Sequence, residues 1–407
     1  MMPRGRLDIG WSDLAHAVAV GPRPGPRPEL ARRLRTHLPD PPRTLVTLSV
    51  RSGFDLLLHA LALPRGSEVL LSALTIRDMA RIVTAHGLVP VPVDLDMDRL
   101  ALDPEALQRA TGPRARVLVV AHLFGSRMPL GRVREFCTAR GLLLVEDCAQ
   151  SFTGLDTTGD PRSDVVMMSF GLIKTHTCLG GAVLVVRFPD LRERMRRIQH
   201  AWPLQPDREV RVRALRAAGV QALLTPACYG SVVGLAGLLG WNHDARLSNS
   251  LRGFPGAGFF ERIRRRPSGA LLALMAHRFE RFDPARLRRR ADAASALLQR
   301  IPHLSVPGRS ASDHTHWLVP VCVPEPEVRM RALWRDGFDA TRGATSLAPV
   351  PSPPGFGHVR TPNVSRCMGE ILFLPAPLGA SRSRLDTLVA HLAAWPAHRA
   401  PAQRACG

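Results

Sequence analysis

Residues 165–186 have the sequence VVMMSFGLIKTHTCLGGAVLVV. The apolar runs DVVMMSF (164–170) and GGAVLVVR (180–187) predict two strands, and the loop between them carries Lys174. Lys174 is the only lysine in a chain of 407 residues that contains 55 lysines and arginines. Because arginine would serve equally well in a salt bridge or on the surface, an amine at this one position indicates a chemical role.

A lysine amine offers chemistry that a guanidinium group does not. A guanidinium group stays protonated, whereas a lysine can lose its proton when it is desolvated or lies near positive charge. The neutral amine then acts as a nucleophile or base and can form an imine with a carbonyl group. We therefore expect Lys174 to lie between two strands as a reactive group.

Outward from this stretch, short apolar runs alternate with amphipathic segments from about residue 44 onward. This alternation predicts an α/β domain with a mostly parallel sheet. The predicted strands are 67–74, 88–96, 115–125 and 142–150, and the predicted helices are 76–87 and 130–141. The strand at 142–150 carries carboxylates at its C-terminal end, the end of an open α/β sheet where ligands bind.

The C-terminal part predicts a second, smaller α+β domain. We expect one helix over 269–301, a strand in 315–323, a helix over 327–337 and a final helix over 381–395. The predicted organisation is an N-terminal arm (1–43), a large domain (44–200), an atypical apolar and basic insertion (201–265) and a small domain (266–407).

The composition of the chain argues against several functional classes, including nucleic-acid-binding proteins and zinc ribbons. The net charge of +21 predicts an anionic partner, but the arginines lack the interleaved aromatic residues of a nucleic-acid groove, so we expect no nucleic acid. Seven cysteines without a CxxC pair predict reduced thiols and no zinc ribbon. The N-terminus has no signal-peptide core, and we expect a cytoplasmic protein without a metal site.

Residues 217–241 form a run without a charged residue. Its length would suffice for a membrane span of about 20 residues, but Pro226 and several glycines disfavour a spanning helix. The pattern favours a buried or interfacial hairpin, and peripheral membrane contact through this run stays open.

Five residues follow one another in an order that suits pyridoxal phosphate. They are Gly53 after the strand-like TLSVRSG (47–53), Asp147 and Gln150 in VEDCAQ, Ser169 and Lys174. This cofactor requires a lysine amine to hold its aldehyde and a carboxylate to keep its pyridine nitrogen protonated. It also needs hydroxyl and backbone N–H groups for its phosphate.

Over residues 46–195 the chain resembles the DegT/DnrJ/EryC1/StrS family of sugar aminotransferases. The similar blocks include SGFDLLLHALALPRGSEVLLSALT, VLVVAHLFG, LLLVEDCAQSFTG and SFGLIKTHTCLGGAVLV. The resemblance implies a fold type I pyridoxal-phosphate enzyme, with a large mixed sheet and a smaller C-terminal domain. It also implies a homodimer that moves an amino group, with glutamate as donor, to a nucleotide-linked keto-sugar.

The resemblance also implies roles for individual residues. Lys174 would form the imine with the cofactor and act as acid and base, and Asp147 would pair with the pyridine nitrogen. Gln150 would contact the phenolic oxygen side of the ring, and Ser169 the phosphate. Gly53, with the N–H of Phe54, would complete the phosphate cup. His122 and His176 are further candidates near the site.

Three positions depart from the family pattern. Phe54 stands where the family has Thr or Ser, and Ile76 stands where an aromatic residue usually stacks on the ring. Arg264, in RRRPSG, stands where an Asn usually reaches the phosphate of the partner subunit. Its forked donors could bind that phosphate.

Two alternatives remain at this point. One is a pyridoxal-phosphate-dependent sugar dehydratase, whose relatives replace the lysine, so that Lys174 counts against it. The other is a non-catalytic or regulatory homologue, attached to a membrane through residues 217–241.

Overall fold

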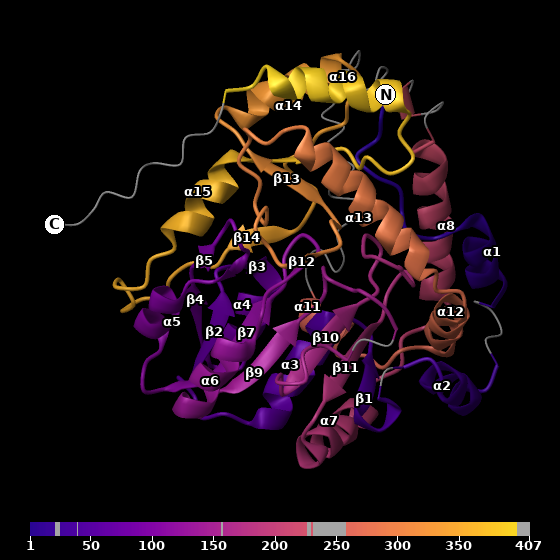
Figure 1. Ribbon diagram of the computed structural model, residues 1–407. Coiled ribbons are helices and arrows are strands. Elements are labelled where there is room, and N and C mark those ends of the chain that lie inside the picture. The colour runs from indigo at the N-terminus through magenta and orange to yellow at the C-terminus, as the bar shows by residue number, and fades with distance from the viewer. Residues whose placement is uncertain (21–24, 39, 156–157, 226–228, 231–257, 397–407) are drawn as a thin grey trace.

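The computed structural model describes residues 1–20, 25–38, 40–155, 158–225, 229–230 and 258–396. A large sheet with flanking helices forms one part of the molecule, and a smaller group of helices and strands lies beside it (Figure 1). The fold is α/β with a large, mostly parallel mixed sheet, as predicted.

The large sheet has seven strands in the order β1-β11-β10-β9-β7-β2-β4. Strand β11 is antiparallel to both of its neighbours, and the pairs from β10 to β4 are all parallel. The strands are β1 (Thr44–Thr47), β2 (Glu68–Ser72), β4 (Val89–Val93), β7 (Ala115–Ala121), β9 (Leu143–Asp147), β10 (Val165–Ser169) and β11 (Ala182–Val186). The lysine loop therefore connects the antiparallel pair β10 and β11, the third and second strands from the β1 edge of the sheet.

Successive side chains of each strand enter different cores, because they point to opposite faces of the sheet. Val165 and Met167 pack against α3 (Val50–Leu61), α4 (Arg77–Ala85) and α7 (Pro189–Ala201). Val166 and Met168 pack on the other face, against α1 (Trp11–Val20), α2 (Arg27–Arg35), α8 (Arg208–Leu223) and α12 (Gly269–Glu280). Helices therefore cover both faces, as parallel sheets require.

The smaller part is built on the antiparallel pair β13 (Val319–Cys322) and β15 (Ile371–Leu374). Its own apolar core includes residues of α13 (Pro284–Gln299), α14 (Pro326–Arg335) and α16 (Arg382–Ala393). The remaining elements are β3 (Leu74–Ile76), β5 (Leu95–Asp96), β6 (Ala101–Leu102), α5 (Pro104–Ala110), β8 (Ser126–Arg127), α6 (Gly131–Arg140), α11 (Phe259–Ile263), β12 (Asp313–His314), β14 (Leu347–Pro349) and α15 (Pro362–Glu370). The three boundaries between the four predicted segments stay predictions.

Two of the predicted elements need correction. The single helix predicted over 269–301 is two helices, because Asp283 caps α13 by accepting the N–H of Ala285 and Pro284 occupies its first turn. The strand-like TLSVRSG ends as a strand at Thr47, since the side chain of Ser49 accepts the N–H of Ser52 and begins α3.

The uncharged run 217–241 lies only partly within the described residues. Its first residues complete α8, and residues 226–228 and 231–241 lie outside. Among the helices that are described, none combines the length and the apolar character that crossing a membrane demands.

Candidate active site

Lys174 lies in the loop that follows β10, on a turn in which its N–H donates to the carbonyl of Gly171. Its Nζ stands 4.3 Å from the centroid of the Trp317 ring. The indole N–H of Trp317 in turn donates to the carbonyl of Ile173 at 3.2 Å. The smaller part of the molecule thus contacts the lysine loop from above the sheet edge and holds an aromatic face against the amine.

The amine of Lys174 is less basic than an ordinary lysine. Burial, opposed by the carboxylate of Asp147 and assisted by the charge of Arg51, lowers its pKa to about 8. A pKa near 8 leaves an appreciable neutral fraction at physiological pH, which a nucleophilic or basic role requires.

Asp147 ends β9, the strand next to β10, and lies beside Met167 in the parallel pair. Its Oδ1 accepts the N–H of Ala149 at 2.9 Å, and its other oxygen makes no hydrogen bond within the described ranges. Burial raises the pKa of this carboxyl, and the hydrogen bond and the charge of Lys174 oppose that rise. The structure thus brings a buried acid with a free oxygen near the amine.

Ser169 and the start of α3 lie at the same edge of the sheet. Both Ser169 and Thr47 face Ala182, from opposite sides of β11, and α3 begins three residues after Thr47. The Oγ of Ser169 makes only a 3.5 Å contact with the N–H of Gly171. A helix N-terminus with nearby hydroxyls is a binding place for a phosphate.

Gly53 and Phe54 lie inside α3, and their part in the predicted phosphate cup stays a prediction. The N–H of Gly53 already donates to the carbonyl of Ser49 at 2.9 Å, inside α3. A Cβ on Gly53 would approach the side chain of Leu184 to 2.6 Å, so the glycine is required by helix–sheet packing. Phe54 is fully buried in the same core.

Gln150 and Ile76 are each held by contacts with other parts of the chain. The Oε1 of Gln150 accepts the N–H of Phe124 at 3.1 Å, which fixes the amide and leaves its NH₂ group as a donor. Ile76 ends β3, pairs with Leu347 of β14 and packs against the core beneath α4. Their contacts with a cofactor stay predictions.

His122 belongs to a buried polar cluster. Its Nδ1 accepts the N–H of Met128, so Nε2 carries the proton and donates to Glu146 at 2.9 Å. Cys148 and Arg127 also donate to Glu146. His122, Glu146 and Cys148 lie close enough to hold a metal ion, but the guanidinium of Arg127 already neutralises the carboxylate. These contacts give His122 a structural role.

His176 and Arg264 also have partners in this chain. The ring of His176 lies among Phe152, Phe279 and Phe282, and burial together with the charge of Arg278 lowers its pKa to about 4. Arg264 donates to both oxygens of Asp55, each at 2.9 Å. The guanidinium group of Arg264, which could bind the cofactor phosphate of a partner subunit, therefore binds Asp55 on α3 in this chain.

Two residues of this site were not found from the sequence, Trp317 and Arg51. Trp317 is in the predicted strand segment 315–323, but no local pattern shows that it meets a loop 143 residues earlier. Arg51 follows the cap of α3, and its Nε donates to Asp78. A capping signal at Ser49 could have placed Arg51 at a helix N-terminus.

The residues present fit pyridoxal phosphate. The amine of Lys174, the free oxygen of Asp147, and the hydroxyl groups beside the first turn of α3 are the donor and acceptor set that this cofactor needs. Asp147 and Ser169 end the adjacent strands β9 and β10, Lys174 follows β10, and α3 follows β1 on the far side of β11.

Comparison with known sequences gives a family match over just under half of the chain. The model of the DegT/DnrJ/EryC1/StrS aminotransferase family matches residues 29–225. A dTDP-3-amino-3,4,6-trideoxy-alpha-D-glucose transaminase from Streptomyces venezuelae is 32% identical over 224 residues, which are 52% of this chain and 57% of that protein. The match thus spans little more than half of the relative's length.

The similarity to solved structures covers nearly the whole chain. The aminotransferase TlmJ from Streptoalloteichus hindustanus has a TM-score of 0.67 and 20% identity, with 96% of this chain and 98% of that chain covered. NtdA from Bacillus subtilis, solved with bound cofactor PMP, also has a TM-score of 0.67, at 16% identity, with coverage of 94% and 80%. At these identities the likeness shows the fold.

Proposed function

We propose that the protein is a pyridoxal-phosphate-dependent aminotransferase of the DegT/DnrJ/EryC1/StrS family, on the premise that residues 29–225 match the model of that family. The observation that carries the proposal is Lys174. It is the only lysine, its amine has a pKa of about 8, and it lies one strand away from a buried acid with a free oxygen.

Pyridoxal phosphate, when bound, supplies an electron sink for the negative charge that forms at Cα of an amino acid. Asp147 would hold the proton on the pyridine nitrogen, and Ser169 with the first turn of α3 would bind the phosphate. Gln150 would donate to the ring oxygen, and Ile76 would give apolar cover. The Nζ of Lys174 would anchor the cofactor and then move the proton of the substrate.

We propose an amino acid as donor, with glutamate as the first candidate, and a nucleotide-linked keto-sugar as acceptor. The Streptomyces venezuelae relative, a transaminase of a dTDP-linked amino sugar, supports this class of acceptor. The net charge of +21 would attract a diphosphate group to the molecule.

A homodimer and a cytoplasmic location also belong to the proposal. The resemblance to the family supports the dimer. The cytoplasm suits the thiols, because the cysteines in the described part of the chain, Cys137, Cys148, Cys178, Cys322 and Cys367, are free and buried.

The experiment is a single half-reaction. The purified protein is loaded with pyridoxal phosphate, freed of excess cofactor and mixed with L-glutamate in the absence of any acceptor. We expect one 2-oxoglutarate per subunit and a loss of the visible absorbance of the bound cofactor. Absorbance should return when a dTDP-linked keto-sugar of the right structure is added. A protein that retains no cofactor would contradict the proposal.

A further inference from the structure

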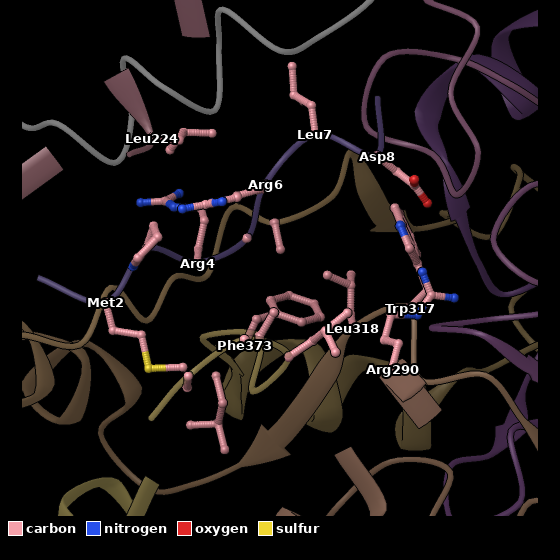
Figure 2. A pocket seen from close by; sticks show the side chains of 18 of the residues that line it. Met2, Arg4, Arg6, Leu7, Asp8, Leu224, Arg290, Trp317, Leu318 and Phe373 are labelled. Atoms are coloured by element: carbon pink, nitrogen blue, oxygen red, sulfur yellow. The ribbon is translucent and has the colours of Figure 1, made fainter. Parts of the chain in front are cut away.

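A cavity of about 660 Å³ opens beside Lys174, between the lysine loop, the N-terminal residues 1–8 and the smaller part of the molecule (Figure 2). Its wall is mainly apolar and includes Ile173, Leu318 and Phe373. The Trp317 ring, which covers the amine of Lys174, and the side chain of Arg290 lie close together at one end of it (Figure 2).

Arg290 is held in this wall by two hydrogen bonds. Its Nε donates to the carbonyl of Thr315 at 3.0 Å, and its Nη1 donates to the hydroxyl of Thr175 at 3.1 Å. Thr175 is the residue after Lys174, and Thr315 lies two residues before Trp317. The guanidinium group is thus fixed between the lysine loop and the segment that covers the amine.

The third nitrogen of Arg290, Nη2, is buried and has no hydrogen-bond partner among the described residues. None of the other described residues that line this cavity has a buried side-chain nitrogen or oxygen without a partner. A buried donor without a partner destabilises a fold, so its presence beside a cavity indicates a ligand that accepts from it.

Arg290 also keeps its charge. Burial, opposed by the charge of Asp8 and assisted by that of Arg286, lowers its pKa to about 10. The group is therefore protonated at neutral pH. Asp8 does not neutralise Arg290 by contact, because its Oδ1 accepts from Arg286 at 2.9 Å and its Oδ2 accepts the N–H of His176. Arg290 thus places a fixed cation with one unpartnered donor in the wall of the cavity.

We propose that Arg290 binds the α-carboxylate of the amino donor and so turns the donor's nitrogen toward Lys174. This inference rests on the proposed aminotransferase function. An α-carboxylate is two bonds from the amino nitrogen that reacts, so its binding group must lie close to the lysine, as Arg290 does through Thr175. The diphosphate of a nucleotide-linked sugar is separated from the reacting carbon by several ring atoms, which argues for the donor.

The test compares Arg290→Gln with Arg289→Gln. Arg289 lies next to Arg290 on α13, its side chain is 60% exposed, and it pairs with the exposed Asp283, so its replacement removes the same charge outside the cavity. Two quantities are measured on the cofactor-loaded proteins. The first is the concentration of L-glutamate that half-saturates the donor half-reaction. The second is the dissociation constant of glutarate, an unreactive dicarboxylate, by calorimetry.

We expect Arg290→Gln to raise both values by about 10- to 100-fold, since a charged hydrogen bond is lost. Arg289→Gln should leave them within about twofold of the wild type. Binding of thymidine diphosphate should be the same in all three proteins. Arg290→Lys keeps the positive charge but loses the forked guanidinium group, so both of its values should fall between those of the wild type and Arg290→Gln. Arg290→Lys replaces Arg290→Gln in the comparison if the latter does not fold.

Unchanged glutamate and glutarate values in Arg290→Gln would overturn the inference. Weaker binding of thymidine diphosphate alone would also overturn it, because the site would then serve a phosphate. If the wild type binds glutarate through Arg290 but converts no glutamate, the proposed function fails while the carboxylate site stands. If Arg290→Gln converts glutamate as well as the wild type, the function stands and the inference fails.

Discussion

The reactivity of Lys174 depends on its immediate neighbours. Burial and Arg51 favour the neutral amine, whereas Asp147 favours the ammonium form, and the balance is a pKa of about 8. At pH 7.4 such an amine is neutral in about a fifth of the molecules, against less than about 0.1% for an unperturbed lysine. The Trp317 ring, which faces the same nitrogen, can still stabilise the charged form.

We therefore predict that acetylation of Lys174 in the cofactor-free protein rises with pH through a midpoint near 8. The amine is protonated and unreactive below this pH and neutral above it. Since the charge of Arg51 lowers the pKa, Arg51→Gln should move the midpoint to higher pH. The measurement is mass spectrometry of the peptide that carries Lys174 after brief labelling at pH 6 to 11. A midpoint near 10.5 in the wild type would contradict this account of the site.

At the scale of elements, the strands around the lysine could be predicted, because runs such as VVMMS and AVLVV are short, apolar and bounded by turns. Helix α3 was missed because its first turn, with Val50 and a serine pair, resembles the end of a strand. Its N-cap is visible only when Ser49 and Ser52 are considered together. Gly53 lies in this helix and packs closely against Leu184, a contact that the sequence alone did not predict.

The packing role predicts that Gly53→Ala lowers the free energy of unfolding by about 1 to 2 kcal/mol. Crowding against Leu184 should outweigh the gain of up to about 1 kcal/mol that alanine brings to a helix. Gly219→Ala is the control, since Gly219 lies in α8 and no described atom lies within 4 Å of its added Cβ. That variant should gain about 0.5 to 1 kcal/mol. Urea unfolding of both proteins gives the values. An equal gain in the free energy of unfolding for Gly53→Ala and Gly219→Ala would show that Gly53 is not crowded.

At the scale of the whole molecule, the contacts that complete the site join segments far apart in the chain, and no local pattern predicts them. Lys174 meets Trp317, and Thr175 meets Arg290. Residues 1–8, the first part of the predicted N-terminal arm, line the cavity. Arg4 donates to both oxygens of the fully buried Asp339.

We predict that Asp339→Asn lowers the free energy of unfolding by about 3 kcal/mol. The substitution removes the negative charge that pairs with the largely buried guanidinium of Arg4. Tyr229 also loses the carboxylate to which its hydroxyl donates. It should also speed hydrogen exchange at the Met2 amide, which donates to the carbonyl of Gly337. Asp386→Asn, which breaks the exposed pair with Arg300, should change stability by less than about 0.5 kcal/mol. Similar losses in the two variants would refute the role of Asp339.

The central claim is that Lys174 anchors pyridoxal phosphate, and borohydride trapping tests it most directly. The wild-type protein and Lys174→Ala are each incubated with the cofactor, reduced, digested and mapped by mass spectrometry. Because the chain has no second lysine, a reduced adduct on a side-chain amine can only lie at position 174. We predict that the wild type carries the adduct on the peptide with Lys174. In Lys174→Ala, both the adduct and the visible absorbance of the bound cofactor should be absent. A wild type without the adduct, or a Lys174→Ala protein with the same absorbance, would contradict the claim.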